Sequence, residues 1–368
     1  MRKIKIAMIG VGSISGIYLN NITKVFKDIE LIGVCDLVKE RALKAQEEFK
    51  ILKVYETMYD AFADEEVDIV LNLTRPYEHF EVSKAALEAG KHVYSEKPLG
   101  ITLEEGLALV ELAKQHNCML GGAPDTFLGA GIQTCRKLID DGMIGDVIGA
   151  NAAMICHGHE TWHPDPEFYY KSGGGPMMDM GPYYVTALIN LVGRVKGVTG
   201  VTKTNFEKRI ITSQPKCGEE ITVEIPTHIM GMLHFENGAV GTILTTFDVH
   251  YKEQCRLEIY GSKGTLIVPD PNCFGGTIKL LRPEDGEYKA MPYLFDYPEN
   301  SRGLGIEDMA RAILTGRPFR ADYTQTLHVL EILTSFEKSS KSKSYVELTT
   351  SFKRHMPMKN NAIHGVLD

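Results

Sequence analysis

The chain has 368 residues, more than one hydrophobic core usually holds, so two domains are expected. Hydrophobic residues make up 43% and charged residues 24%, as in an ordinary soluble globular protein. The net charge of -8 excludes the basic face that nucleic acid requires, and no stretch is long and apolar enough to span a bilayer. Seven scattered cysteines without a CxxC pair favour a reducing, cytoplasmic location.

The first segment predicts a nucleotide-binding loop. A short apolar run ends in Gly10-Val11-Gly12 and opens a helix. Gly10 permits a tight turn, and Gly12 lets a pyrophosphate approach the backbone. The N–H groups that follow, at Ser13 and Ile14, would then hold the phosphates at the helix N-terminus. Ser15 stands where the strict fingerprint has its third glycine, so the motif is a variant.

The second apolar run supports this interpretation because it ends in Asp36. A carboxylate at this place accepts hydrogen bonds from the adenosine ribose. It also repels a 2′-phosphate, so we expect NAD rather than NADP. Lys39 and Arg41 lie close by and keep NADP as the less favoured alternative. Asp36 could also serve only as the N-cap of the next helix.

Elements follow one another in a simple order. Over residues 1–124, apolar runs alternate with amphipathic stretches, which predicts an N-terminal Rossmann domain, a doubly wound parallel sheet. Strands are expected at 4–9, 31–35, 53–55, 67–73, 92–95 and 119–122, and helices at 39–49, 78–89 and 102–116. Residues 125–368 predict an α+β domain with a large, mostly antiparallel open sheet. It would hold a helix at 129–140, strands at 147–155, 198–203, 221–235, 239–248, 256–260 and 265–268, and helices at 306–314 and 324–339. Residues 282–300 and the tail after 353 are expected to be loose.

Two strand ends carry candidate chemistry, because ligands of open α/β sheets bind outside the carboxyl ends of the strands. The first is Thr74-Arg75-Pro76 and the second is Glu96-Lys97-Pro98. Lys97 would face the nicotinamide, where burial and the cofactor's positive charge would lower its pKa and make it a proton donor or acceptor. The alternative is a surface lysine at a strand end.

A second cluster follows a glycine-rich loop. Asp179 and Tyr183 are four residues apart and share a face of a helix. Pro182 lies between them, so the helix either bends there or restarts there with Asp179 in the preceding turn, and both geometries leave the two side chains on one side. The carboxylate could orient the phenol or fix a substrate hydroxyl. The alternative is a capping aspartate and a core tyrosine.

The third cluster, residues 157–165, holds three histidines and two acids. A metal site is the weaker interpretation, because these residues have no fixed helix or strand register. We expect no metal and instead a polar, aromatic loop that lines a substrate pocket. Trp162, the chain's single tryptophan, suits stacking on a sugar ring.

Together these motifs resemble those of the Gfo/Idh/MocA oxidoreductases over nearly the whole chain. The marks are Gly10-Val11-Gly12 with Asp36, residues 74–79, residues 89–98 and the run 174–183. The resemblance implies a Rossmann domain, a second domain whose open sheet forms an oligomer interface, and therefore a homo-oligomer. It implies that Lys97, Asp179 and Tyr183 are catalytic, with Tyr183 where many members have histidine.

The resemblance also implies the remaining site residues. Cofactor contacts fall on Gly10, Gly12, Ser13, Ile14, Asp36, Thr74, Pro76, His79, Glu96 and Lys97. Asp125 departs from the family's pattern, so we expect it to shape the substrate pocket. The other expected substrate contacts are His159, Trp162, His163 and Tyr170.

The resulting hypothesis is an NAD-dependent dehydrogenase that acts on a secondary hydroxyl of a carbohydrate or glycoside, with the sugar C3 hydroxyl as one specific version. Tyr183 is the favoured base, with Lys97 as its electrostatic support. One alternative is an NAD-dependent glycoside-cleaving enzyme that retains its cofactor. The other is a non-catalytic dinucleotide-binding sensor, which would not need all three catalytic residues.

Overall fold

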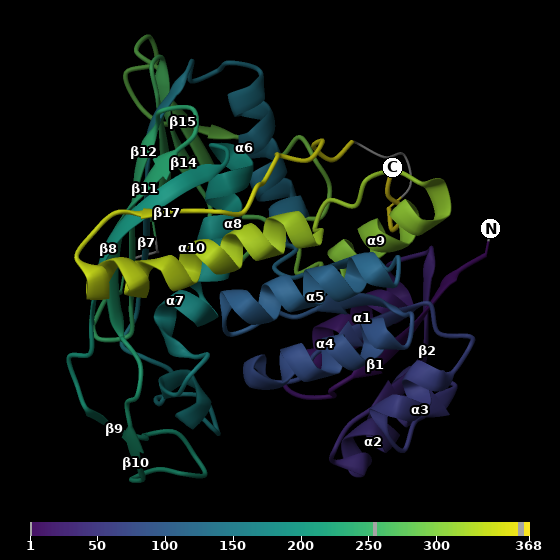
Figure 1. Ribbon diagram of the computed structural model, residues 1–368. Helices are drawn as coiled ribbons and strands as arrows, with labels where there is room; N and C mark the ends of the chain where they lie inside the picture. Colours follow the sequence, from purple (N-terminus) through teal and green to yellow (C-terminus); the bar gives the residue numbers. More distant parts are fainter. Residues whose placement is uncertain (1, 253–255, 360–363) are drawn as a thin grey trace.

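The computed structural model describes residues 2–252, 256–359 and 364–368. Its strands form two large sheets, and the second lies beside the first domain rather than in line with it (Figure 1). A two-stranded ribbon extends from one end of the second sheet. No helix in the described part of the chain has both the length and the apolar character needed to cross a membrane.

The first sheet has six parallel strands in the order β3-β2-β1-β4-β5-β6. This order confirms the doubly wound Rossmann prediction. The strands are β1 (Ile4–Ile9), β2 (Ile29–Cys35), β3 (Lys53–Val54), β4 (Ile69–Asn72), β5 (His92–Ser95) and β6 (Leu120–Gly122). The helices between them are α1 (Ser15–Lys24), α2 (Lys39–Phe49), α3 (Met58–Ala63), α4 (His79–Glu88) and α5 (Leu103–Gln115). Thr102 caps α5 by accepting the N–H of Glu105.

The second sheet has nine strands in the order β16-β15-β14-β13-β7-β12-β11-β8-β17. Only β7 and β12 run parallel, so the sheet is mostly antiparallel, as predicted. Its strands are β7 (Val147–Ile155), β8 (Val195–Lys203), β11 (His228–Phe235), β12 (Val240–Thr246), β13 (Arg256–Gly261), β14 (Gly264–Val268), β15 (Ile278–Leu281), β16 (Lys289–Met291) and β17 (Val346–Glu347). Met230 and Val201 are exposed on one face, so that face is open in the single chain.

Helices fill the space between this sheet and the first domain (Figure 1). They are α6 (Ala130–Asp140), α7 (Gly175–Asp179), α8 (Gly181–Leu191), α9 (Leu304–Thr315) and α10 (Tyr323–Ser342). Every residue of α8 is buried, and α10 packs against both β8 and α5. The last helices therefore return to the first domain and hold the two sheets together.

One predicted strand is wrong in its extent. The expected strand 221–235 is two strands, β10 (Glu220–Thr222) and β11. Pro226 lies between them, and proline has no N–H to donate to a ladder. β10 pairs with β9 (Lys208–Ile210) in the separate ribbon. The stretch 282–300, expected to be loose, contains β16, which pairs with β15.

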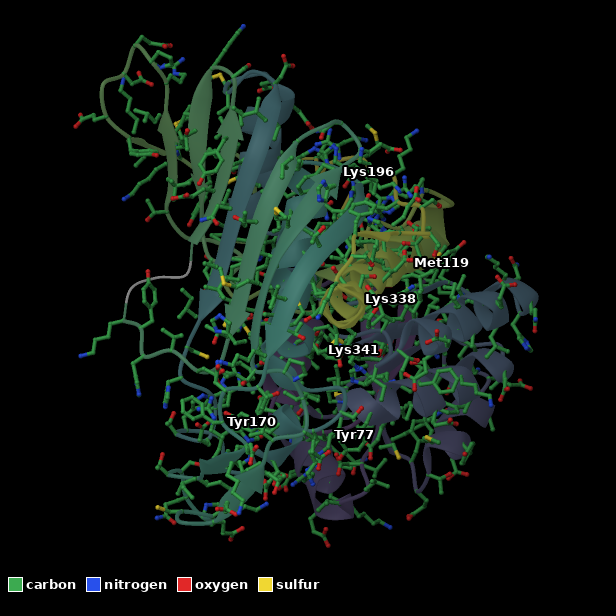
Figure 2. All side chains as sticks on the ribbon, turned by 60° about the vertical axis from the view of Figure 1, so that its left-hand side comes forward. Tyr77, Met119, Tyr170, Lys196, Lys338 and Lys341 are labelled. Carbon is green, nitrogen blue, oxygen red and sulfur yellow. The ribbon has the colours of Figure 1, made fainter. Side chains whose placement is uncertain are left out.

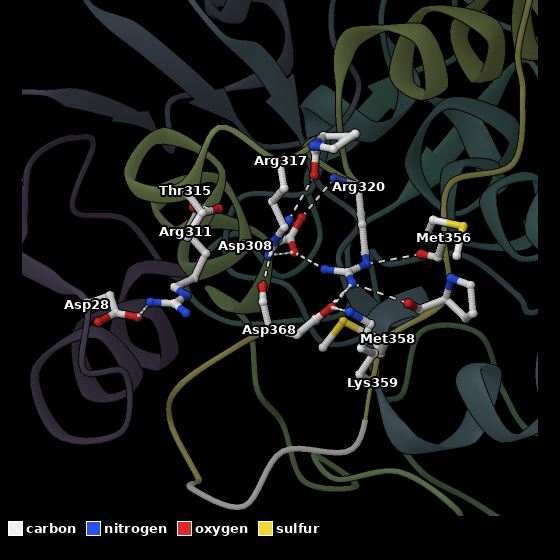
Figure 3. Close-up of polar contacts among 12 residues, drawn as sticks. Asp28, Asp308, Arg311, Thr315, Arg317, Arg320, Met356, Met358, Lys359 and Asp368 are labelled. Atoms are coloured by element: carbon white, nitrogen blue, oxygen red, sulfur yellow. Dashed lines mark hydrogen bonds and ion pairs between the residues drawn. The ribbon is translucent and has the colours of Figure 1, made fainter.

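The tail after residue 353 is also more ordered than expected over its described residues. Figure 3 shows that the Arg320 guanidinium binds the carboxylates of Asp308, at 2.6 Å, and Asp368, at 2.8 Å. The carbonyl of Gly365 accepts the N–H of Lys27 at 3.0 Å, back in the first domain. Arginine has five donors to satisfy, and here it holds the end of the chain against α9.

Candidate active site

A cleft of ≈ 1150 Å³ opens at the carboxyl ends of β1, β2 and β4. The glycine loop and the start of α1 line one side, and residues 36–38 with Arg41 continue that wall. Residues 74–78 line the middle, and residues 163–165 with Phe168 and Tyr169 close the far end. The cleft thus runs from the first domain to the loop that precedes α7.

The two glycines of the loop have different roles. Gly10 has φ +95°, and a Cβ there would lie 2.7 Å from the carbonyl oxygen of Leu73. The turn therefore needs glycine both for its backbone angle and for its packing. A Cβ at Gly12 would meet no atom within 4 Å, because this residue faces the open cleft.

The loop fits a dinucleotide pyrophosphate. Gly12, Ser13 and Ile14 are exposed, and their N–H groups donate to no acceptor within the described chain. They stand at the N-terminus of α1, where unpaired amides and the helix dipole favour an anion. The side chain missing at Gly12 leaves room for that anion to reach the backbone.

Asp36 supports the loop as well as facing the cleft. Its carboxylate accepts the N–H of Val11 at 2.6 Å and that of Val38 at 2.8 Å. It is not the N-cap of α2, whose N-cap residue is Val38. Lys39, one of the two cations that follow Asp36 in the sequence, is paired with Glu56 at 2.5 Å.

The ends of β4 and β5 meet beside the cleft. Thr74 and Pro76 line it. His79 is only 1% exposed, and its ring nitrogens lie 2.7 Å from the carbonyl oxygen of Pro98 and 3.0 Å from that of Thr74. It therefore fixes the backbone on either side instead of lining the cleft. The Glu96 carboxylate accepts hydrogen bonds from the Tyr18 hydroxyl at 2.7 Å and from the backbone N–H of Lys97 at 3.0 Å.

Lys97, Asp179 and His159 form one connected group, drawn from three distant parts of the sequence. The Lys97 ammonium donates to the Asp179 carboxylate at 2.8 Å and to the Asp179 carbonyl at 2.6 Å. The other carboxylate oxygen lies 2.9 Å from His159 Nε2. Trp162 donates its indole N–H to His159 Nδ1 at 3.2 Å. Because an indole only donates, neutral His159 carries its proton on Nε2 and donates it to Asp179.

Tyr183 completes the group from α8. The break between α7 and α8 at Met180 confirms the predicted helix restart and leaves Asp179 at the end of α7. The Lys97 ammonium lies 5.2 Å from the centre of the Tyr183 ring. Arg302 donates to the Tyr183 hydroxyl at 3.4 Å, and its guanidinium carbon lies 5.9 Å from the centre of the same ring.

The charges of this group differ from one sequence-based expectation. Burial alone would lower the pKa of Lys97, but Asp179, Tyr183 and Glu96 raise it above its usual range. Sequence reasoning expected burial and the cofactor's positive charge to lower the pKa of Lys97, whereas among the chain's own groups the pairing with Asp179 outweighs burial and raises it. Burial would raise the pKa of Asp179, but Lys97 and His159 lower it well below its usual range. Both groups stay charged.

The Tyr183 phenol is the titrating candidate. Burial raises its pKa above the usual value, and Glu96 adds to this. Lys97 and Arg302 act in the opposite direction. The net effect raises the pKa of Tyr183, and the two nearby cations oppose that rise.

The loop 157–165 lies against this group through only some of its residues. His163 lines the cleft, and Trp162 is 61% exposed beside it. Tyr170, labelled in Figure 2 below the nine-stranded sheet, is fully buried and donates to Glu160, so it does not reach the cleft. Its neighbour Tyr169 does, with its ring 4.4 Å from that of His159.

A salt bridge joins the loop to the opposite wall of the cleft. Arg75, at the end of β4, binds Asp165 at 2.9 Å, and Lys216 binds the same carboxylate at 2.7 Å. Asp165 thereby links the first domain to the loop. The guanidinium of Arg75 also lies 6.0 Å from the ring centre of Phe168.

Asp125 contacts backbone rather than open space. It is 1% exposed, and its carboxylate accepts the N–H groups of Gly303 and Gly305 at 2.8 and 3.0 Å. Burial raises its pKa to about 6, against the effect of these amides and of Arg302. Its role is to fix the segment that carries Arg302.

Sequence reasoning missed Arg302 and Asn272, and it did not predict the bridge between Arg75 and Asp165. Arg302 and Asn272 lie in loops with no periodic pattern. Arg302 precedes the glycine that begins the turn into α9, and that Ser-Arg-Gly step was the only local signal.

Comparison with known proteins identifies the family. Residues 4–122 match the model of an oxidoreductase family with an NAD-binding Rossmann fold, and residues 132–267 match the GFO/IDH/MocA C-terminal domain. The chain is similar to the levoglucosan dehydrogenase of Pseudarthrobacter phenanthrenivorans, with 27% identity over 55% of this chain and 56% of that protein. It therefore spans little more than half of that relative.

Other relatives align over more of their length. The chain is 24% identical to the myo-inositol 2-dehydrogenase of Thermotoga maritima over 83% of this chain and 86% of that protein. It is 26% identical to the D-glucoside 3-dehydrogenase of Escherichia coli over 70% and 74%. An apo levoglucosan dehydrogenase structure superposes with a TM-score of 0.84 at 20% identity, covering 96% of this chain and 100% of that one. The chain belongs to the GFO/IDH/MocA family of NAD-binding oxidoreductases.

Proposed function

We propose that this protein is an NAD-dependent dehydrogenase of a sugar or glycoside secondary hydroxyl, and that the C3 hydroxyl is oxidised. The observation that carries the proposal is the group of Lys97, Asp179 and Tyr183 beside a cleft that fits a dinucleotide. NAD, when bound, supplies the acceptor for the hydride of the substrate carbon. The C3 position is supported by the name of one relative, a D-glucoside 3-dehydrogenase.

The cofactor would lie along the glycine loop. The amides of Gly12, Ser13 and Ile14 would hold its pyrophosphate, and Asp36 would face the adenosine ribose. Asp36 favours NAD over NADP, because a 2′-phosphate would meet its carboxylate. Of the two cations that follow Asp36, Lys39 is already paired with Glu56, whereas Arg41 lines the cleft and keeps NADP as the less favoured alternative.

Lys97 would orient the substrate. An ammonium has three N–H groups, and Asp179 takes two of those of Lys97. The third remains for the oxygen of the reacting hydroxyl. Asp179 and His159 fix the direction of this N–H, and the high pKa of Lys97 keeps the ammonium charged while negative charge develops on that oxygen.

Tyr183 would accept the hydroxyl proton. Lys97 and Arg302 both lie near its ring, and it is the one group of the three whose charge can change during the reaction. The reaction starts from the Tyr183 phenolate. As the substrate carbon loses hydride, the hydroxyl proton passes to the phenolate oxygen and the carbinol becomes a ketone. The oxidation is then balanced, with two electrons leaving on the hydride.

The aromatic wall would receive the sugar ring. His163 and Tyr169 line the far end of the cleft, and the Trp162 ring lies 5.3 Å from that of His163. Flat aromatic faces suit the C–H face of a pyranose. Tyr170 is left out of the proposed substrate contacts because its hydroxyl is bonded to Glu160 within the core.

The test is NADH formation with a panel of methyl glycosides and their deoxy analogues. We expect methyl glucosides to yield NADH, the 2-deoxy and 4-deoxy analogues to yield it more slowly, and the 3-deoxy analogue to yield none. NADH from the 3-deoxy analogue at the rate of its parent would contradict oxidation at C3. No NADH from any sugar, cyclitol or glycoside would contradict the dehydrogenase itself.

One observation favours the cofactor-retaining alternative as the second candidate. The Arg75–Asp165 bridge crosses the cleft and would lie in the way of cofactor exchange. A glycoside-cleaving enzyme that recycles its NAD in place would release aglycone without free NADH. Aglycone release from a chromogenic glycoside, measured with and without added NAD on protein purified with its bound nucleotide, separates the two functions.

A further inference from the structure

Arg302, the second cation near Tyr183, differs from Lys97 in its surroundings. Lys97 is balanced by the Asp179 carboxylate at 2.8 Å. Over the described residues, Arg302 has no carboxylate within ion-pair distance. Its guanidinium is held by neutral oxygens, the Asn272 side chain at 2.7 Å and the Asn300 side chain at 2.8 Å. Arg302 therefore brings to Tyr183 a positive charge that no ion pair within the described residues balances, while Glu96 and Asp125 act on it at longer range.

The position of this guanidinium is fixed from several directions. Its carbon atom lies 5.9 Å from the ring centre of Tyr183 and 6.0 Å from that of Phe274. Asn272 accepts from the same nitrogen that donates to the Tyr183 hydroxyl. The carboxylate of Asp125 accepts the N–H groups of Gly303 and Gly305, which follow Arg302 in the chain.

The direction of the hydrogen bond matters for the chemistry. A guanidinium only donates, so the Tyr183 oxygen accepts from Arg302 and its own proton points elsewhere. A donor aimed at a phenol oxygen binds the phenolate more tightly than the phenol, because charge-assisted hydrogen bonds are stronger. The bond from Arg302 therefore favours the phenolate, the form of Tyr183 that can take a proton from a substrate, and opposes burial, which raises the pKa of Tyr183.

We propose that Arg302 is a positioning residue that holds the Tyr183 oxygen as an acceptor and supplies the unbalanced positive charge that stabilises its phenolate. The catalytic role of Arg302 rests on the proposed function, whereas its effect on the titration of Tyr183 can be measured without it. Asn272 and Asp125 are the residues that keep Arg302 in place.

Other charged and titratable groups also face Tyr183. They are Lys97 and Glu96 after β5, Tyr94 on β5 and Tyr169 before α7. Lys97 is held at its place by Asp179 in every variant considered below, so a change at Arg302 tests one cation against an otherwise unchanged group.

The experiment compares Arg302→Gln with Arg302→Lys in protein that carries fluorotyrosine. Fluorination lowers phenol pKa values and brings the titration into the range where the protein stays folded. The fluorine resonance lost in Tyr183→Phe identifies Tyr183. We expect Arg302→Gln to raise its titration midpoint by about 1–2 pH units, the usual effect of removing an opposite charge at this range. Because lysine keeps the positive charge, Arg302→Lys should raise the Tyr183 midpoint by no more than half as much.

The same shift should appear in the acid limb of the pH–rate profile of the active enzyme. A Tyr183 midpoint that stays within about 0.3 pH units in Arg302→Gln would overturn the proposal, since the expected shift is several times larger. If Arg302→Gln does not fold by circular dichroism, Asn272→Ala replaces it, with a smaller upward shift expected and the same result counting against the proposal. The readouts are separable: a shifted resonance in a protein that oxidises no sugar supports the role of Arg302 and rejects the dehydrogenase.

Discussion

Lys97→Met is the substitution whose effects follow most directly from the contacts of the site. It removes the ammonium that donates to Asp179 and, in the proposed reaction, to the substrate oxygen. We expect kcat/KM to fall by about 10²–10⁴-fold, the range for loss of a group that acts on the transferring proton or its oxygen. The dissociation constant of NADH should change by less than about threefold, because the ammonium is engaged with Asp179 and does not reach the glycine loop.

The cost to stability can be bounded from the same contacts. Breaking a buried ion pair by removing one partner costs about 3–5 kcal/mol of unfolding free energy. Here Asp179 keeps its hydrogen bond from His159, and each side chain of the pair is 15% exposed. We therefore expect about 1–3 kcal/mol, which leaves a folded protein if its stability is in the usual range of about 5–15 kcal/mol.

The assays are NADH formation with the best glycoside, NADH binding by fluorescence, and urea unfolding. Lys91→Met is the matched control: Lys91 precedes β5 as Lys97 follows it, and its ammonium donates to the carbonyl oxygens of Asp64 and Val67 at 2.7 and 2.9 Å. We expect the control to lose stability but keep its activity. If Lys97→Met retained kcat/KM within about tenfold of the unchanged protein, the role given to its ammonium would be refuted.

Three further predictions concern other parts of the chain. Gly10→Ala places a Cβ 2.7 Å from the carbonyl oxygen of Leu73 at φ +95° and should lower the free energy of unfolding in urea by at least about 1 kcal/mol. Gly12→Val should fold normally and lose NADH binding, measured by fluorescence. Normal NADH affinity in the valine variant would contradict the placement of the pyrophosphate. Trp162→Phe removes the N–H donated to His159 and should lower kcat about three- to tenfold, the kinetic equivalent of one neutral hydrogen bond; an unchanged kcat would show that the tautomer needs no support. Burial lowers the pKa of His328 to about 4, so its contribution to stability is complete above about pH 6.5 and is lost as the pH falls toward 4. We expect a loss of about 2–3 kcal/mol from this source, absent in His328→Gln, and equal acid sensitivity of the two proteins would count against it.

Local patterns predicted what local interactions decide. The bounds of α2 and β7 match the sequence-based ranges, because the first has clear helical periodicity and the second a simple strand pattern. The break at Met180, just before Pro182, was readable from the missing N–H of proline. The motifs at the strand ends predicted that Lys97 and Thr74 lie near each other, because the carboxyl ends of parallel strands lie at the same edge of a sheet.

What the sequence could not provide depends on long-range contact. Arg302 meets Tyr183 across 119 residues, and no pattern in either segment points to the other. The choice between Tyr169 and Tyr170 depends on the register of a short 3-10 turn, which composition does not reveal. The pKa of Lys97 was predicted in the wrong direction because its close pairing with Asp179 could not be known before the two segments were placed together.

The contact between Lys27 and Gly365 has a consequence for how the chain is made. Synthesis delivers the N-terminal residues first, and N-terminal domains generally fold first. The six-stranded sheet can therefore assemble on the ribosome while the end of the chain is still missing. The carboxylate of Asp368 and the carbonyl of Gly365 become available to Arg320 and Lys27 only after these two late residues have been synthesised. A nascent chain arrested before residue 364 would hold an unfinished form of the enzyme, in which the first domain is formed and its closure with α9 is not.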